Sequence, residues 1–160
     1  MDDKFAGGEI LDIGIQIEKN GKEFYEAFAA KTQNDGVKRI FKYLANEEEK
    51  HIAAFEHLRK EREGDSMDVN FPDEYAAYMS ALAKDHVFPS REKAQELMNS
   101  MTTDIQAVET AIQFEKDSIV VFGGMKKIVR PKDVDVLEEL IHQENIHLEQ
   151  LFDLKKKIGK

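Results

Sequence analysis

Cysteine is absent from this chain of 160 residues, and proline occurs only three times. The lack of cysteine excludes disulfides, thiolate chemistry, iron–sulfur clusters and cysteine-based zinc sites from these residues. Scarce proline, together with 34% charged residues, favours a mostly helical chain. Long apolar runs are also missing, since the longest, such as YAAYMSALA, reach only about half of a membrane span. We therefore expect no membrane-spanning helix.

Positively charged residues are fewer than negatively charged ones, and the formal net charge is −9. This balance offers no basic surface for nucleic acid, and an anionic membrane would repel it. The first ten residues, MDDKFAGGEI, contain no cationic stretch followed by an apolar one, so no signal peptide is expected. With 41% apolar residues the chain can build one core. We expect a single cytoplasmic domain over residues 1–160, without nucleic-acid or membrane partners.

Four long stretches place apolar residues at every third or fourth position, the pattern of amphipathic helices. Asn34 or Asp35 can cap the second helix, and Thr103 with Gln106 has capping-box spacing at the start of the third. Pro131 suits the first turn of the fourth helix. The expected helices cover residues 8–32, 34–63, 102–128 and 131–157.

The segment 64–101, between the second and third helices, is too long for a hairpin turn. It contains two shorter helical patterns, FPDEYAAYMSALAKDHV and SREKAQELMNSM, the second with Ser90 as its cap. Such a crossover carries the chain back along a bundle, so the second and third long helices should run parallel. The expected fold is all-α, with helical hairpins over 8–63 and 102–158 forming a four-helix bundle with a long, partly helical crossover.

The two expected hairpins resemble each other in sequence. IQIEKNGKEFY in the first helix aligns with IQFEKDSIVVF in the third, and NEEEKHIAAFEHL in the second aligns with IHQENIHLEQLFDL in the fourth. The two alignments have nearly the same offset, which indicates one helical hairpin used twice. The repeat pairs Glu18 with Glu115, Glu48 with Glu144, and His51 with His147.

These six residues lie on the apolar faces of their helices. Buried carboxylates without a partner are costly, and four together repel one another, so a cation is expected among them. Gln33, inside the first expected turn, lies halfway between Glu18 and Glu48. The midpoint of Glu115 and Glu144 falls beside VRP in the second turn. Each carboxylate is thus about 15 residues, or roughly 22 Å, from its turn, and all four can share one layer.

Several other glutamate, histidine and tyrosine residues could be mistaken for ligands, and we do not expect them in the ligand set. Glu139 and His142 also have Glu-x-x-His spacing, but a shift of five residues turns them about 140° away from Glu144, so they should be solvated. Tyr25, two turns after Glu18 on the same face, is either core filler or a partner for a metal-binding carboxylate. The remaining candidates are expected at the surface: His57, His86, Glu47 and Glu49.

Two glutamates plus two Glu-x-x-His pairs on four helices form the ligand set of di-iron and di-manganese carboxylate bundles. Glutamate and histidine at positions i and i+3 share a helix face, so each pair can chelate one ion. Four carboxylate charges would balance two divalent ions. Iron or manganese suits these ligands, and zinc remains an alternative. We expect two iron ions per chain, held by Glu18, Glu48, His51, Glu115, Glu144 and His147.

On these residues, and with Tyr25 following Glu18, the chain resembles the rubrerythrin branch of the ferritin-like superfamily. The resemblance implies a ferritin-like bundle that reduces hydrogen peroxide at a di-iron site and protects cells living with little oxygen. It also implies roles for the ligands: bridging for Glu48 and Glu144, terminal for Glu18 and Glu115, and binding to one ion each for His51 and His147.

Two features depart from that family. Rubrerythrins usually carry a rubredoxin domain with four cysteines, whereas these residues contain none, so electrons should come from a separate protein. Peroxide-reducing members also tend to have a further carboxylate three residues after the third-helix glutamate, where this chain has Ser118. We expect a homodimer that reduces peroxide or oxygen. The alternatives are a ferroxidase-like iron-handling protein and a bundle whose metal is structural or sensory.

Overall fold

The computed structural model describes residues 7–61, 77, 81 and 91–160. The helices are α1 (Gly7–Lys31), α2 (Asp35–Lys60), α4 (Arg91–Ser100), α5 (Asp104–Met125) and α6 (Val134–Ile158). The described residues contain no strand, so the expected all-α class is confirmed. Within the same ranges, no helix is long and apolar enough to cross a membrane.

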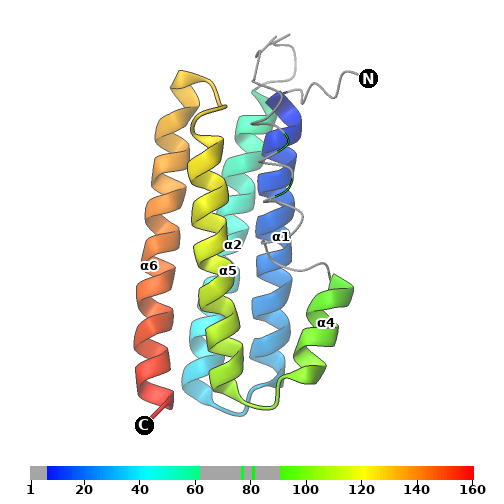
Figure 1. Ribbon diagram of the computed structural model, residues 1–160, viewed down its shortest axis with the longest axis vertical. Helices are drawn as coiled ribbons and strands as arrows, with labels where there is room; N and C mark the ends of the chain where they lie inside the picture. Colours follow the sequence, from blue (N-terminus) through cyan, green and yellow to red (C-terminus); the bar gives the residue numbers. More distant parts are fainter. Residues whose placement is uncertain (1–6, 62–76, 78–80, 82–90) are drawn as a thin grey trace.

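The four long helices stand side by side as a bundle, with α4 against the outside of α1 (Figure 1). Within the bundle, α1 packs against α2 and α5 against α6, and further contacts join α2 to α6 and α1 to α5. In the view of Figure 1, α1 and α6 run downward while α2 and α5 run upward. The second and third long helices are therefore parallel, as the long crossover predicted.

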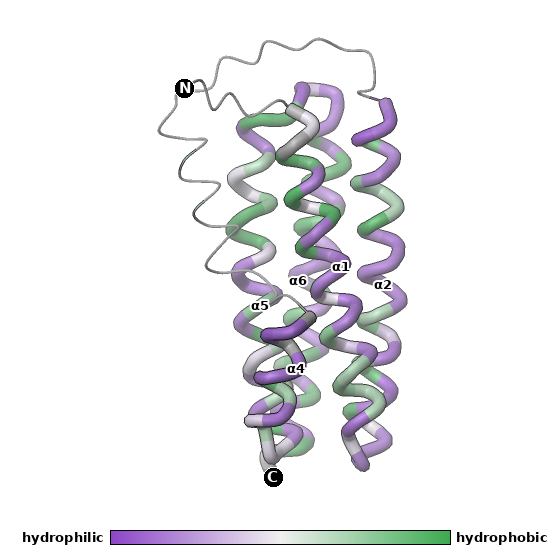
Figure 2. The backbone as a smooth tube through the Cα atoms, turned by 90° about the vertical axis from the view of Figure 1, so that its right-hand side faces the viewer, coloured by the Kyte–Doolittle hydropathy of each residue, from purple (hydrophilic) through white to green (hydrophobic). Residues whose placement is uncertain are grey.

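The expected crossover is described only in part. Helix α4 confirms the pattern in SREKAQELMNSM. Ser90 and almost all of FPDEYAAYMSALAKDHV lie outside the described residues. Along the long helices, apolar and polar residues alternate at short intervals (Figure 2), which is what helices with one buried face require.

Two helix starts are confirmed by their caps. Asn34 accepts hydrogen bonds through Oδ1 from the backbone N–H groups of Gly36 and Val37. Thr103 and Gln106 form the expected capping box at the start of α5. These side chains satisfy backbone donors that a helix terminus leaves unpaired.

Other boundaries differ from the predictions. Helix α2 ends at Lys60 instead of near residue 63, and α5 ends at Met125 instead of Ile128. Beyond α5 the backbone changes to i→i+3 hydrogen bonds, such as that from the Ile128 N–H to the Met125 carbonyl. The fourth helix is preceded by a short 3₁₀ helix, Pro131–Asp133. A buried ion pair between Arg130 and Asp133, at 2.6 Å, holds that turn.

Aromatic side chains pack on both sides of the polar layer that the sequence predicted. Tyr25 contacts Phe41 with ring centroids 5.4 Å apart, and Phe55 contacts Phe122 at 5.2 Å. In α2, Phe41 lies about two turns before Glu48 and Phe55 about two turns after it. The charged layer is therefore enclosed between two apolar layers of the core.

Candidate metal centre

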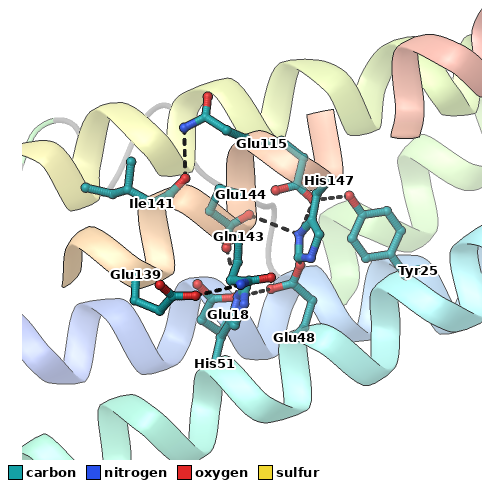
Figure 3. Close-up of polar contacts among 11 residues, drawn as sticks. Glu18, Tyr25, Glu48, His51, Glu115, Glu139, Ile141, Gln143, Glu144 and His147 are labelled. Carbon is teal, nitrogen blue, oxygen red and sulfur yellow. Dashed lines mark hydrogen bonds and ion pairs between the residues drawn. The ribbon is translucent and has the colours of Figure 1, made fainter. Parts of the chain in front are cut away.

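Each long helix turns one carboxylate toward the bundle axis, and two helices add a histidine one turn later. All six residues predicted as ligands are almost fully buried, with at most 3% of each residue's surface exposed. The structure brings them together in one cluster (Figure 3). Its members are Glu18 from α1, Glu48 and His51 from α2, Glu115 from α5, and Glu144 and His147 from α6.

The cluster consists of two overlapping groups of four residues that share Glu48 and Glu144. Glu18 and His51 complete one group, and Glu115 and His147 complete the other. In each group, one nitrogen or oxygen atom from every residue lies within 4.8 Å of the others. Each group is therefore compact enough to surround one ion.

The two shared carboxylates each place one oxygen beside each histidine. Glu144 Oε1 lies 2.8 Å from Nδ1 of His51, and its Oε2 lies 3.4 Å from Nδ1 of His147. Glu48 repeats this arrangement, with its two oxygens 3.6 Å from the same two nitrogens. A carboxylate that faces both halves of a cluster is placed to bridge two ions.

The unshared carboxylates each approach one histidine. Glu18 Oε2 is 3.4 Å from His51 Nδ1, and Glu115 Oε1 is 3.8 Å from His147 Nδ1. Tyr25 donates a hydrogen bond from its hydroxyl to Glu115 Oε1 (Figure 3). Tyr25 therefore acts on a carboxylate of the opposite hairpin and not on Glu18, which precedes it on α1.

Most of the oxygen and nitrogen atoms in the cluster that could bind a metal ion have no hydrogen-bond partner among the described residues. Both oxygens of Glu48 and Glu144, and both ring nitrogens of His51 and His147, are buried without a hydrogen-bond partner among the described residues. The short approach between His51 and Glu144 therefore lacks hydrogen-bond geometry. Buried polar atoms are normally satisfied, and carboxylate with imidazole is a ligand set for iron, manganese or zinc. The residues fit a metal site.

Comparison with known proteins agrees with this chemistry. A family model described as Rubrerythrin matches residues 9–155. The chain belongs to the rubrerythrin family. The matched range contains all six clustered residues and Tyr25. Searches of curated proteins and of solved structures found no match.

In this rubrerythrin cluster, burial raises the pKa of three carboxyl groups. Burial and Glu144 raise the pKa of Glu18, and burial with Glu18 raises that of Glu48 well above its usual range. Burial and Glu144 raise the pKa of Glu115 to about 8. Glu144 is the exception: burial and Glu48 push its pKa upward, but contacts with Glu115 and both histidines outweigh them and lower it.

The two histidines hold protons more tightly than an ordinary imidazole. Burial disfavours the charged ring, but the carboxylates of Glu144 and Glu18 raise the pKa of His51 strongly. Glu115 and Glu144 in the same way raise the pKa of His147 to about 10. Without metal, both rings are therefore protonated at neutral pH. Metal cations would take the place of these protons.

The competing Glu-x-x-His pair is excluded by its position. Glu139 and His142 are exposed, and Glu139 accepts a hydrogen bond of 2.7 Å from Gln143. The register of α6 therefore selects Glu144 and His147, as the repeat predicted.

Of the four predictions for surface residues, two are confirmed, one is untested and one is wrong. His57 and Glu49 are exposed, and His86 lies outside the described residues. Glu47 was expected in solvent, and that prediction is wrong. It is 9% exposed and pairs with Lys50 at 2.5 Å, because the lysine one turn later supplies a counter-charge at the edge of the core.

Ser118 was named from the sequence only as a departure from the family, and neither the burial of this residue nor the position of two nearby phenylalanines was predicted. Ser118, one turn after Glu115, is 1% exposed, and its hydroxyl has no hydrogen-bond partner in the described part of the chain. Phe55 and Phe122, which were not singled out from the sequence, pack against each other on one side of the carboxylate layer. The i+3 and i+7 spacing of Ser118 and Phe122 from Glu115 was the available signal for their position.

Proposed function

We propose that this protein is a rubrerythrin-type oxidoreductase that holds two iron ions and reduces peroxide or dioxygen. The observation that carries the proposal is the placement of Glu48 and Glu144, each with one oxygen beside each histidine. Membership of the rubrerythrin family supports it. Two ferrous ions at such a site would supply the two electrons that reduce an O–O bond.

The protein's own residues hold, orient and shield the site. Glu48 and Glu144 would bridge the ions, and Tyr25 fixes the direction of Glu115 through its hydroxyl. Burial and the charge of Glu115 raise the pKa of Tyr25 well above its usual value, so the phenol keeps its proton. The apolar layers above and below exclude bulk water, which strengthens the electrostatic interactions inside.

The proposal includes two partners. These 160 residues contain no cysteine and hence no rubredoxin-type iron site, so reducing electrons have to enter from outside them. A separate electron-donor protein fits that requirement. A homodimer is proposed from the family resemblance.

Two measurements test this function. Elemental analysis of protein purified without added metal should find about two iron ions per chain. The ferrous protein, treated anaerobically with one equivalent of peroxide, should then show the absorption of ferric iron, and metal-free protein should not. Inertness toward both peroxide and dioxygen would overturn the redox proposal in favour of structural metal. Iron uptake well beyond two ions per chain would favour iron handling instead.

A further inference from the structure

The internal repeat makes Glu18 and Glu115 equivalent, so their surroundings can be compared directly. Each is followed, two turns later, by an aromatic residue: Tyr25 after Glu18, and Phe122 after Glu115. Tyr25 reaches across to Glu115, so the repeat places Phe122 on the side of Glu18. Phe122 has no hydroxyl. Glu18 and Glu115 each have one buried oxygen without a hydrogen-bond partner within the described ranges, and they differ in that Oε1 of Glu115 accepts the bond from Tyr25.

The two aromatic residues lie at opposite sides of the carboxylate layer. Tyr25 packs against Phe41, which precedes the layer in α2, whereas Phe122 packs against Phe55, which follows it. The half of the cluster with Glu115 and His147 therefore includes a phenol hydroxyl. On the side of Glu18 and His51, the equivalent position in the repeat is Phe122, which carries no hydroxyl.

We infer that the two halves bind metal with unequal affinity. The half with Glu115 and His147 takes the first ion and holds it more tightly, and the half with Glu18 and His51 is the exchangeable position. The reason is that a hydrogen bond that fixes a ligating carboxylate raises metal affinity, and its loss typically costs about 10–100-fold. This inference rests on the proposed function, since it requires a two-ion site.

A cobalt titration of the metal-free, full-length protein separates the two positions. Co²⁺ is added anaerobically and its visible absorption followed in the variants His51→Ala and His147→Ala. Two successive Co²⁺ binding steps in the wild type would not by themselves show unequal positions, because repulsion between the ions would weaken binding of the second ion even in a symmetric cluster. We expect His51→Ala to keep one ion at the affinity of the first wild-type step. His147→Ala should bind its remaining ion at least about 10-fold more weakly.

The hydroxyl itself is tested by Tyr25→Phe, which keeps the ring in place. We expect this change to lower the affinity of the first step by about 10-fold or more and to leave the second step nearly unchanged. Tyr43→Phe is the matched control, because it removes the same group from an exposed tyrosine of α2 that is outside the cluster. The control should leave both steps unchanged.

The outcomes distinguish this inference from the function on which it rests. Equal affinities in His51→Ala and His147→Ala, or an effect of Tyr25→Phe on the second step alone, would overturn the inequality and leave the two-ion site intact. A wild-type protein that binds no Co²⁺ would contradict the proposed function as well.

Discussion

Among single residues, Glu48 and Glu144 are distinguished by facing both histidines. Replacing either with alanine removes a ligand from both halves of the cluster, so we expect the protein to lose most of both ions. Glu139→Ala, on the exposed face of α6, should leave the metal content unchanged. Elemental analysis of the purified variants measures this. Metal loss in the Glu139 variant with retention in the Glu144 variant would contradict the assignment.

Ser118 buries a hydroxyl that has no hydrogen-bond partner among the described residues. Such a group loses its hydration on folding without compensation, which costs about 1–3 kcal/mol. Alanine is also the better helix former by about half a kcal/mol. We therefore expect Ser118→Ala to stabilise the metal-free protein by at least about 1 kcal/mol, measured by urea unfolding. A destabilised variant would show that the hydroxyl has a partner.

The identities of the six clustered residues could be predicted from the sequence, because helical spacing and the repeat depend only on local order. The partner of Tyr25 could not. Tyr25 shares a helix face with Glu18, and its contact with Glu115 depends on α1 lying next to α5, which is a tertiary feature. Similarly, no local pattern showed that Lys50 would allow Glu47 to be buried.

At the level of the helices, starts were easier to predict than ends. The starts of α2 and α5 are fixed by side-chain caps that are visible in the sequence, at Asn34 and Thr103. The end of α5 is not, because Gly123 and Gly124 weaken its last turn and the backbone continues in tighter i→i+3 bonds. The 3₁₀ turn before α6 contains the Arg130–Asp133 pair, and the burial of both side chains depends on tertiary packing.

Helices α1 and α2 approach closely where Gly14 meets Phe55. A Cβ atom added at Gly14 would lie 2.6 Å from Cε1 of Phe55, a ring that is fully buried and packed against Phe122. Gly14→Ala should therefore destabilise the protein by about 1–3 kcal/mol, as overpacking does. Gly123→Ala in α5 is the control, since its Cβ meets nothing within 4 Å. It should stabilise by up to about 1 kcal/mol. Denaturant unfolding of both variants decides the point.

For the molecule as a whole, the cluster links metal binding to folding. Six buried polar side chains converge on one layer of the core, and metal ions that bind only the folded state stabilise it by mass action. Free metal at about 100 times its dissociation constant adds about 2.7 kcal/mol. We expect a chelator at neutral pH to lower the melting temperature by at least about 5 °C. Equal melting of loaded and metal-free protein would contradict a buried metal site.

Without metal, the shifted pKa values determine how stability depends on pH. The pKa of Glu115 is about 8 in the fold against 4.5 ordinarily, so as pH falls below 8 the folded state takes up its proton first and becomes more stable. His147, with a pKa of about 10 against 6.5, gives stabilisation that is complete below 6.5 and lost as pH rises through 10. The pKa of Glu144 is lowered, so this group changes stability only below pH 4.5, which is outside the neutral range.

Both shifts have the same sign, so the metal-free protein should melt at a higher temperature near pH 6 than near pH 8.5. A gain of about 1 kcal/mol corresponds to roughly 2–4 °C in a domain of this size.

A lower pH also reduces the general repulsion of a chain with net charge −9, so a control has to separate the cluster from the surface. Glu115→Gln provides it, because the amide can still accept the hydrogen bond of Tyr25 but no longer titrates. Thermal unfolding followed by circular dichroism at constant ionic strength should show a smaller pH effect in this variant. The same pH effect in both proteins would mean that Glu115 does not contribute to it.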